Sequence, residues 1–440
     1  MAYYHSLHLH SRSLWSSLPW LGRKFSRTQR VVNNLYHLQK CYLICPSLVQ
    51  SIKDYSSLSN NLCSDSAQVL HATSSSTGVI SSRREQISHP EATINTLKQE
   101  ERAVTSTSSD GRVMLIDGTS IIYRAYFKLL AKLNHGHLSH ADGNGDWVLT
   151  IFTALSLIID VLKILPSHVA VVFDHDGTPF GHTSISSKEN FRAKGTNFRH
   201  TLYPSYKSNR PPTPDTVVQG LQYLKAAIKA MSINVIEVPG VEADDVIGTL
   251  AIRSVEAGFK VRIVSPDKDF FQILSPSLRL LRIAPRGIEM VSFGMEEFAE
   301  RYGDLKPSQF VDVVALMGDS ADNIPGVDGI GNVHAVDLII KFGTLENLLQ
   351  CVDQVESEHI RKALIAQADQ AMLSKNLAML RCDLPFYMVP FDTRQLTFKK
   401  PEDNGEKFTS LLTAISAYAE GFSADKIIRR AFNLWKELGS

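Results

Sequence analysis

The sequence predicts an α/β fold, in which a parallel sheet covered by helices is followed by a smaller helical region. Three observations support this prediction. Short apolar runs alternate with segments of helical length between residues 112 and 264. Acids stand at or close to the ends of these runs, as at Asp117, Asp174 and Asp267. After a predicted hairpin at 278–291, the pattern is helical to about residue 380. Alternating strands and helices favour a parallel sheet whose functional groups lie at the carboxyl ends of its strands.

The individual elements follow from local signals. A strand at 113–116 precedes Asp117-Gly118, and Thr119 or Ser120 is placed to cap a helix that runs to about Leu133. The remaining predicted elements are a helix at 148–165, a strand at 169–173, a helix at 215–231, a strand at 233–237, a helix at 242–257 and a strand at 260–264.

The first 109 residues have a different composition. Seven lysines and arginines precede the first acid, Asp54, and serines are frequent throughout. Basic, serine-rich and acid-poor segments are typical of organelle transit peptides. We therefore expect residues 1–109 to be a transit peptide and linker, addressed to the mitochondrion, with the chloroplast or both organelles as alternatives. A disordered basic arm that binds nucleic acid is a further alternative.

Composition also excludes some classes of protein. The 440 residues carry a net charge of only +1, so any affinity for nucleic acid must come from local basic patches. None of the five cysteines shows paired C-x-x-C spacing, which argues against a disulfide framework or a zinc site. The longest apolar segments are interrupted by charges, so we predict no membrane span.

Nine acids are candidate metal ligands. Carboxylates gathered at strand ends suggest a hard cation such as magnesium, and nine exceed what one ion can use. Two ions about 4 Å apart would share them and clamp both oxygens of a phosphodiester displacement. The alternative for Glu242-Ala243-Asp244-Asp245 is an ordinary acidic helix start. The nine acids are Asp117, Asp174, Glu242, Asp244, Asp245, Asp267, Asp269, Asp319 and Asp322.

Two further stretches favour nucleic acid. Residues 176–214 interleave cations with aromatic side chains, as expected of a segment that grips single strands, although a solvated loop is the alternative. Within it, Lys207 and Arg210 are spaced to share a helix face. Residues 326–331 form a glycine-rich turn that would present amides to a phosphate, or that needs glycine only for positive φ.

Together these motifs resemble the 5′-nuclease family, which includes the 5′–3′ exonuclease domain of bacterial DNA polymerase I, phage 5′-nucleases and flap endonucleases. The similarity is closest to the stand-alone organellar proteins of plants. The matching motifs, in family order, are Leu115-Ile116-Asp117-Gly118 with Tyr123-Arg124, Val172-Phe173-Asp174, Tyr206-Lys207 with Arg210-Pro211-Pro212, Glu242-Ala243-Asp244-Asp245, Asp267-Lys268-Asp269 and Gly318-Asp319 to Gly331.

The resemblance implies a division of the chain. A PIN-like nuclease domain would occupy residues 110–300, with an arch at about 176–214. A helix-three-turn-helix subdomain of the helix-hairpin-helix type, which binds DNA, would follow at 301–400. Residues 401–440 would be a C-terminal extension. Residues 181–196 would be an insertion relative to most members, and the resemblance does not extend to a polymerase domain.

The resemblance also implies roles for the site residues. Asp117, Asp174, Glu242 and Asp244 would hold one Mg²⁺, and Asp267, Asp269 and Asp319 a second, with Asp245 and Asp322 acting through water. Mn²⁺ would substitute for Mg²⁺, and K⁺ would assist the glycine turn. Arg124, Lys207 and Arg210 would be catalytic. The DNA contacts would come from Tyr206, Lys207, Arg210, Gly326, Val327, Gly329, Ile330 and Gly331.

The implied activity is metal-dependent 5′–3′ exonuclease and 5′-flap endonuclease cleavage in organellar DNA replication and repair. Substrates would be DNA with 5′ flaps, nicks or 5′ ends, and RNA–DNA primers. A separate polymerase and ligase would act on the same DNA, and the nuclease would be a monomer. One alternative is a haloacid-dehalogenase phosphatase, because Ala170 to Thr178 fits its opening motif. A DNA-structure-binding protein with a weak site is another.

Overall fold

The protein is described from a computed structural model, which covers residues 111–134, 145–175, 197–283 and 289–438. The predicted transit peptide, the insertion at 181–196 and residues 284–288 of the predicted hairpin lie outside the described residues. The domain boundaries given above stay predictions.

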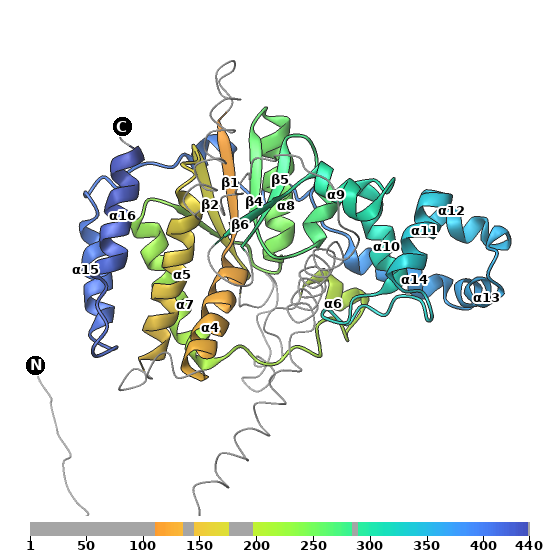
Figure 1. Ribbon diagram of the computed structural model, residues 1–440, viewed down its shortest axis with the longest axis horizontal. Coiled ribbons are helices and arrows are strands. Elements are labelled where there is room, and N and C mark those ends of the chain that lie inside the picture. The colour runs from red at the N-terminus through yellow and green to blue at the C-terminus, as the bar shows by residue number, and fades with distance from the viewer. Residues whose placement is uncertain (1–110, 135–144, 176–196, 284–288, 439–440) are drawn as a thin grey trace, which may run out of the picture. The chain divides into compact units, whose positions relative to one another are not determined.

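A six-stranded sheet lies at the centre of the described chain, with strand order β3-β2-β1-β4-β5-β6 (Figure 1). Every neighbouring pair is parallel except β5 and β6, which form an antiparallel hairpin. Ile116 of β1 pairs with Val171 on one side and Val264 on the other. The strands are β1 (Arg112–Asp117), β2 (His168–Phe173), β3 (Asn234–Glu237), β4 (Lys260–Val264), β5 (Leu278–Ile283) and β6 (Met290–Phe293).

Both faces of the sheet are buried, because side chains alternate along each strand. In β1, Met114 and Ile116 join one apolar cluster, whereas Val113 and Leu115 join the other. Helices α4 (Gly118–Asn134), α5 (Asp146–Leu162) and α7 (Asp215–Ala230) cover the first face. Helix α8 (Ala243–Glu256) covers the second. The predicted α/β fold with a parallel-dominated sheet is confirmed.

A helical region follows the hairpin and shares the apolar cluster of the α8 face. Phe271, which follows β4, packs against Phe298, Tyr302 and Phe310 of this region. Aromatic packing therefore ties the helical region to the sheet. Its helices are α9 (Met295–Tyr302), α10 (Phe310–Met317), α11 (Asn332–Phe342), α12 (Leu345–Gln350), α13 (Glu358–Ala366) and α14 (Ala368–Ala378).

The C-terminal extension forms two helices, α15 (Glu406–Ser416) and α16 (Asp425–Leu438), which pack on α7 and α5 respectively. Trp435 is buried there against Phe408. Arg430 reaches α5, where its Nη2 lies 2.6 Å from Asp160 Oδ1. Within the described residues, no helix is long and apolar enough to cross a bilayer.

Most predicted element boundaries agree with the structure to within about three residues. One local prediction is wrong: α4 is capped by Asp117 and not by Thr119 or Ser120. The Ser120 amide donates to Asp117 Oδ1 at 2.8 Å, as a helix N-cap requires. A strand-ending aspartate can therefore also begin the next helix.

Candidate active site

Acids from four neighbouring strands lie at one edge of the sheet. Asp117 ends β1, Asp174 follows β2, Asp244 begins the helix after β3, and Asp267 follows β4. Since β3, β2, β1 and β4 are adjacent and parallel, their carboxyl ends meet at the same edge. The placement expected from the sequence therefore holds for these four residues.

Asp117 is held by three hydrogen bonds. Ser120 donates from its amide at 2.8 Å and from its hydroxyl at 2.5 Å, and Ser265 Oγ donates at 2.8 Å. Burial nevertheless raises the pKa of Asp117 to about 6, and the charge of Asp174 adds to the rise. Ser120 and Ser265 were not predicted as site residues, although Ser265 directly follows the apolar run of β4.

Asp174 connects two parts of this edge. Its amide donates to Thr119 Oγ1 at 3.0 Å, and its Oδ1 accepts from the Ala243 amide at 2.8 Å. A carboxylate from β2 thus takes an N-terminal amide of α8, where the helix dipole favours a negative charge. This contact brings the acids of α8 to the end of β2.

Three further acids repel one another in the same place. Burial raises the pKa of Asp244, Asp267 and Asp269 above the usual range. The charges of Asp117 and Asp267 add to the rise for Asp244, and that of Asp267 adds to the rise for Asp269. Among the described residues, Asp269 Oδ1 is buried without a hydrogen-bond partner.

Asp319 joins them from the helical region. It lies in the loop after α10, where its Oδ1 accepts from the Ala321 amide at 2.8 Å. Lys268 Nζ lies 3.4 Å from its Oδ2. The charge of Asp319 contributes to the raised pKa values of Asp267 and Asp269. An acid of the helical region therefore interacts electrostatically with acids that follow the sheet strand β4.

The other three predicted ligands are paired with cations. Lys207 contacts Glu242 and lies 3.6 Å from Asp322, and Arg210 lies 2.5 Å from Asp322. Although burial opposes it, the nearby cations hold the pKa of Glu242 and of Asp322 below the usual range. The nine acids therefore form two groups. Within the described residues, the unpaired group comprises five acids without an ion pair, Asp117, Asp174, Asp244, Asp267 and Asp269, together with Asp319, whose one cation is Lys268. The paired group is Glu242, Asp245 and Asp322.

Arg199 is the main residue that sequence reasoning missed. It lies in α6 (Phe198–Leu202), is only 3% exposed and donates to Glu242 at 2.8 Å and to both oxygens of Asp245 at 2.7 and 2.9 Å. It also donates to the carbonyls of Leu377 and Met379. The Arg381 amide donates to Asp245 as well. This arrangement gives Asp245 a structural ion pair and does not support its predicted role at a metal.

The predicted DNA contact of Tyr206 is not supported either. Its side chain is 3% exposed, and its hydroxyl donates to Glu242 and Asp322, each at 3.2 Å. Lys207 and Arg210 do not share a helix face, because they lie in a turn in which Lys207 has a φ of 54°. Arg124 lies in the second turn of α4, the helix that begins beside Asp117, and burial lowers its pKa.

The glycine turn precedes α11 as predicted, but only part of it faces outward. Gly326 is buried, and its amide donates to Ser374 Oγ at 3.1 Å. The side chains of Val327 and Ile330 are buried. Gly329, with a φ of 79°, and Gly331, which caps α11, are exposed. Of the five predicted contacts, Gly329 and Gly331 keep the required exposure, and the predicted K⁺ stays a prediction.

The donor set fits a hard divalent cation in its chemistry. It offers only carboxylate oxygens, several with raised pKa values, and includes the buried and unpartnered Asp269 Oδ1. Within the part of the chain that the structure describes, however, no three His, Cys, Asp or Glu side chains lie close enough together to form a metal-binding group. The acids are thus neighbours that interact electrostatically and are not a preformed cage.

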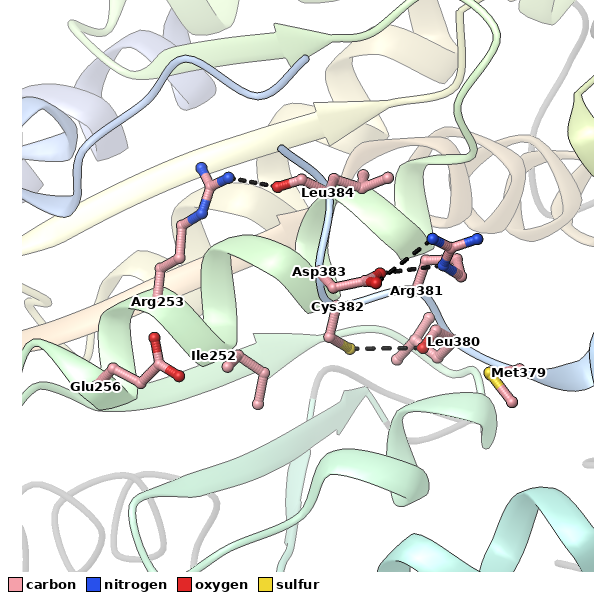
Figure 2. Close-up of a pocket in the computed structure, with 9 residues that line it drawn as sticks. All are labelled: Ile252, Arg253, Glu256, Met379, Leu380, Arg381, Cys382, Asp383 and Leu384. Carbon is pink, nitrogen blue, oxygen red and sulfur yellow. Dashed lines mark hydrogen bonds and ion pairs between the residues drawn. The ribbon is translucent and has the colours of Figure 1, made fainter. Parts of the chain in front are cut away.

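A hollow of about 550 Å³ lies elsewhere, between α8 and residues 379–384. Figure 2 shows Arg253, Arg381 and Cys382 around it, with Arg253 bonded to the Leu384 carbonyl. Burial raises the pKa of the Cys382 thiol to about 12, so the thiol is not an activated nucleophile. None of the predicted site residues lines this hollow, and we do not assign it to the chemistry of the acids.

Comparison with known proteins identifies two domains in this chain. Residues 189–303 match the family model of the 5′–3′ exonuclease N-terminal resolvase-like domain. Residues 305–404 match that of the 5′–3′ exonuclease C-terminal SAM fold. The two domains follow each other in a single chain, and this protein belongs to the 5′–3′ exonuclease family.

Two relatives illustrate the extent of the similarity. DNA polymerase I of Bacillus caldotenax is 36% identical over 276 residues, which are 62% of this chain and 28% of that protein. Thermostable DNA polymerase I of Thermus filiformis is 34% identical over 294 residues, or 67% of this chain and 31% of that protein. The chain therefore spans less than a third of the length of these relatives.

Solved structures with a similar course of the chain include phage T5 flap endonuclease with DNA and metal ions. It has a TM-score of 0.47 and 18% identity, with coverage of 74% of this chain and 99% of that one. The catalytic core of Rad2 in complex with DNA substrate has a TM-score of 0.46 and 16% identity, with coverage of 74% and 92%. The family assignment rests on the sequence matches.

Proposed function

We propose that this protein is a divalent-metal-dependent 5′–3′ exonuclease and 5′-flap endonuclease that hydrolyses phosphodiester bonds of DNA. The observation that carries the proposal is the unpaired acid group. Six acids from four strand ends and one loop gather at one edge of the sheet, and burial raises the pKa of four of them, Asp117, Asp244, Asp267 and Asp269. They lie in a chain that contains both domains of the 5′–3′ exonuclease family.

The unpaired acids would hold the metal. A bound divalent cation would supply Lewis-acid stabilisation of charge that develops on the scissile phosphate. The chain itself orients these acids: Ser120 and Ser265 fix Asp117, and the start of α8 fixes Asp174. Lys207 and Arg210 lie beside the acids and would attract the phosphodiester backbone.

The exposed part of the glycine turn would dock duplex DNA. Gly331 precedes the first turn of α11, and residues 332–334 are exposed. A helix N-terminus offers unsatisfied amides and a positive dipole end, which suit a phosphate and read no base sequence. Duplex affinity without sequence preference is expected.

Cleavage assays test the proposal. The protein is incubated with 5′-flap, nicked and RNA-primed duplexes in the presence of Mg²⁺, Mn²⁺ or EDTA, and separately with p-nitrophenyl phosphate. We expect 5′-end cleavage of DNA with either metal and none with EDTA. Phosphatase turnover without DNA cleavage would instead favour the haloacid-dehalogenase alternative.

The cellular setting is part of the proposal. A basic, acid-poor first segment suggests import into the mitochondrion, with the chloroplast or both as alternatives. A separate polymerase and ligase would then complete Okazaki-type processing of the same DNA. Fluorescence microscopy of residues 1–109 fused to a reporter tests the location, and a diffuse cytosolic signal would contradict it.

A further inference from the structure

Two short segments that lie more than 100 positions apart are joined by hydrogen bonds beside the acids, and we call this set of hydrogen bonds the interlock. The Lys207 turn comprises residues 203–210, and the acid loop comprises residues 319–324. The Lys207 amide donates to the Asp322 carbonyl at 2.9 Å. Asn209 Nδ2 donates to the Ser320 carbonyl at 2.6 Å, and Asn323 Nδ2 donates to the Ser205 carbonyl at 2.6 Å. Each segment thus gives a side-chain amide to the backbone of the other.

The hydrogen bonds between the two segments stabilise two residues whose backbone conformation is unfavourable. Lys207 has a φ of 54° and Asn323 a φ of 56°. The left-handed region is sterically unfavourable for most residues that carry a side chain, although asparagine enters it more readily. A lysine persists there only when its surroundings hold it, and such residues cluster at functional sites.

The interlock differs in kind from the ion pairs next to it. Lys207 contacts Glu242 and Asp322, and Arg210 contacts Asp322, through charged side chains. A phosphate that enters the site competes for these cations. The three neutral hydrogen bonds do not involve the charged groups, so they keep the backbone of the turn in place when the cations change partner.

We propose that Asn323, supported by Asn209, is a positioning residue that holds the Lys207 turn against the acid loop, so that the Lys207 ammonium faces the scissile phosphate. This inference rests on the proposed nuclease function. Asn323 acts through Lys207 and touches neither the substrate nor a metal. Asn323 would thus have a role of its own, separate from that of the neighbouring acid Asp322.

Asn323→Gly tests the role, because glycine tolerates the positive φ and removes only the amide. We expect the single-turnover rate on a 5′-flap duplex with Mg²⁺ to fall at least tenfold, while affinity for the same duplex in Ca²⁺ changes less than threefold. Asn209→Ala removes the second amide and should slow cleavage about threefold. An unchanged rate for Asn323→Gly would overturn the proposal.

Asn404→Gly is the matched control. Asn404 has a φ of 53° and lies in the C-terminal extension away from the acids, so the same substitution there should leave cleavage unchanged. Equal rate losses for Asn404→Gly and Asn323→Gly would also overturn the proposal, since the effect would then be general loss of structure.

A double-mutant cycle separates positioning from a merely structural role. Lys207→Ala should slow the parent enzyme strongly but slow Asn323→Gly less than threefold further, because the turn no longer presents Lys207. Fully multiplicative effects would overturn the inference while leaving the nuclease function intact. A parent protein that cleaves no DNA would instead overturn the proposed function, and the inference with it.

Discussion

The unpaired and paired acid groups lie side by side, yet their electrostatics differ in sign. Burial and mutual repulsion raise the pKa values of Asp117, Asp244, Asp267 and Asp269. Lysine and arginine side chains lower those of Glu242 and Asp322 despite burial. A cluster of acids is therefore not one site, because mutual repulsion dominates in one group and pairing with cations dominates in the other.

Asp244→Asn should produce the largest effect on activity. It removes a charge from the unpaired group without removing a contact to DNA, so cleavage should fall at least about a thousandfold, or about 4 kcal/mol in the barrier. Duplex affinity should change little. Single-turnover cleavage and fluorescence anisotropy measure the two quantities.

Asp245→Asn provides the contrast to that prediction. It belongs to the paired group, so its main effect should be on stability, through the weakened ion pair with Arg199. If Asp245→Asn and Asp244→Asn reduced cleavage equally while both proteins remained folded, the division into two groups would be wrong.

Arg199→Met should produce the largest loss of stability. It leaves Glu242 and Asp245 buried without their cation, and breaking a buried pair in this way costs about 3–5 kcal/mol. Urea denaturation measures the free energy of unfolding. Arg210→Met is the control, because the Arg210 side chain is 50% exposed and a surface pair contributes about 0–1 kcal/mol. Equal losses for both variants would contradict a structural role for Arg199.

The pH dependence of stability should have opposite signs for the two groups. A folded-state pKa of about 6 for Asp117, raised from 3.8, means that as the pH falls this carboxyl binds its proton in the folded protein before it does so in the unfolded chain. In EDTA, this acid should therefore lower stability as the pH rises from about 4 to about 6. Glu242 and Asp322, with depressed pKa values, contribute stability that is lost as the pH falls below about 4.

Thermal melts of the EDTA-treated protein between pH 3.5 and 7 measure this dependence. Asp117→Asn should flatten the decline between pH 4 and 6, whereas Asp322→Asn should flatten the acid limb. Reversed assignments would show that the pairing described for the two groups is wrong.

Gly329→Val should give the smallest of these effects and leaves both acid groups untouched. The positive φ of Gly329 opposes a side chain, and a Cβ at this position would lie only 2.8 Å from His359 Nε2. Duplex affinity should fall about three- to tenfold, with cleavage of bound substrate preserved. Gly331→Ala is the control, because a Cβ there meets nothing within 4 Å. Equal losses of duplex affinity for the two variants would mean that any side chain added to this exposed turn weakens binding, whether or not it strains the backbone.

The sequence predicts the unpaired group well because its signal is local. An apolar run that ends in an acid places that acid at a strand's carboxyl end, and adjacent parallel strands then bring such ends together. Asp117, Asp174 and Asp267 follow this rule. The α/β order and the helical region are predicted for the same reason, since hydrophobic periodicity is read within a short window.

The sequence alone does not distinguish the paired acids from the unpaired ones, because the cations that pair with them are distant along the chain. Arg199 lies 46 positions from Asp245 and 178 from Leu377. Arg199 and Tyr206 stand in a cationic, aromatic stretch whose composition is typical of an exposed nucleic-acid contact. Only the tertiary fold shows that these two side chains are buried and bonded to acids. The N-cap of α4 is missed because an acid at a strand end, Asp117, is interpreted as a ligand alone.

The reach of Arg199 has a consequence for the order of events during synthesis. Its hydrogen bonds to Leu377 and Met379 need a stretch of chain that leaves the ribosome after both the sheet and α8. Until then, the acids at the start of α8 lack their full set of partners. The end of α14 and the residues just after it therefore complete the surroundings of Glu242 and Asp245, and a chain released before them would carry these acids without their full set of partners.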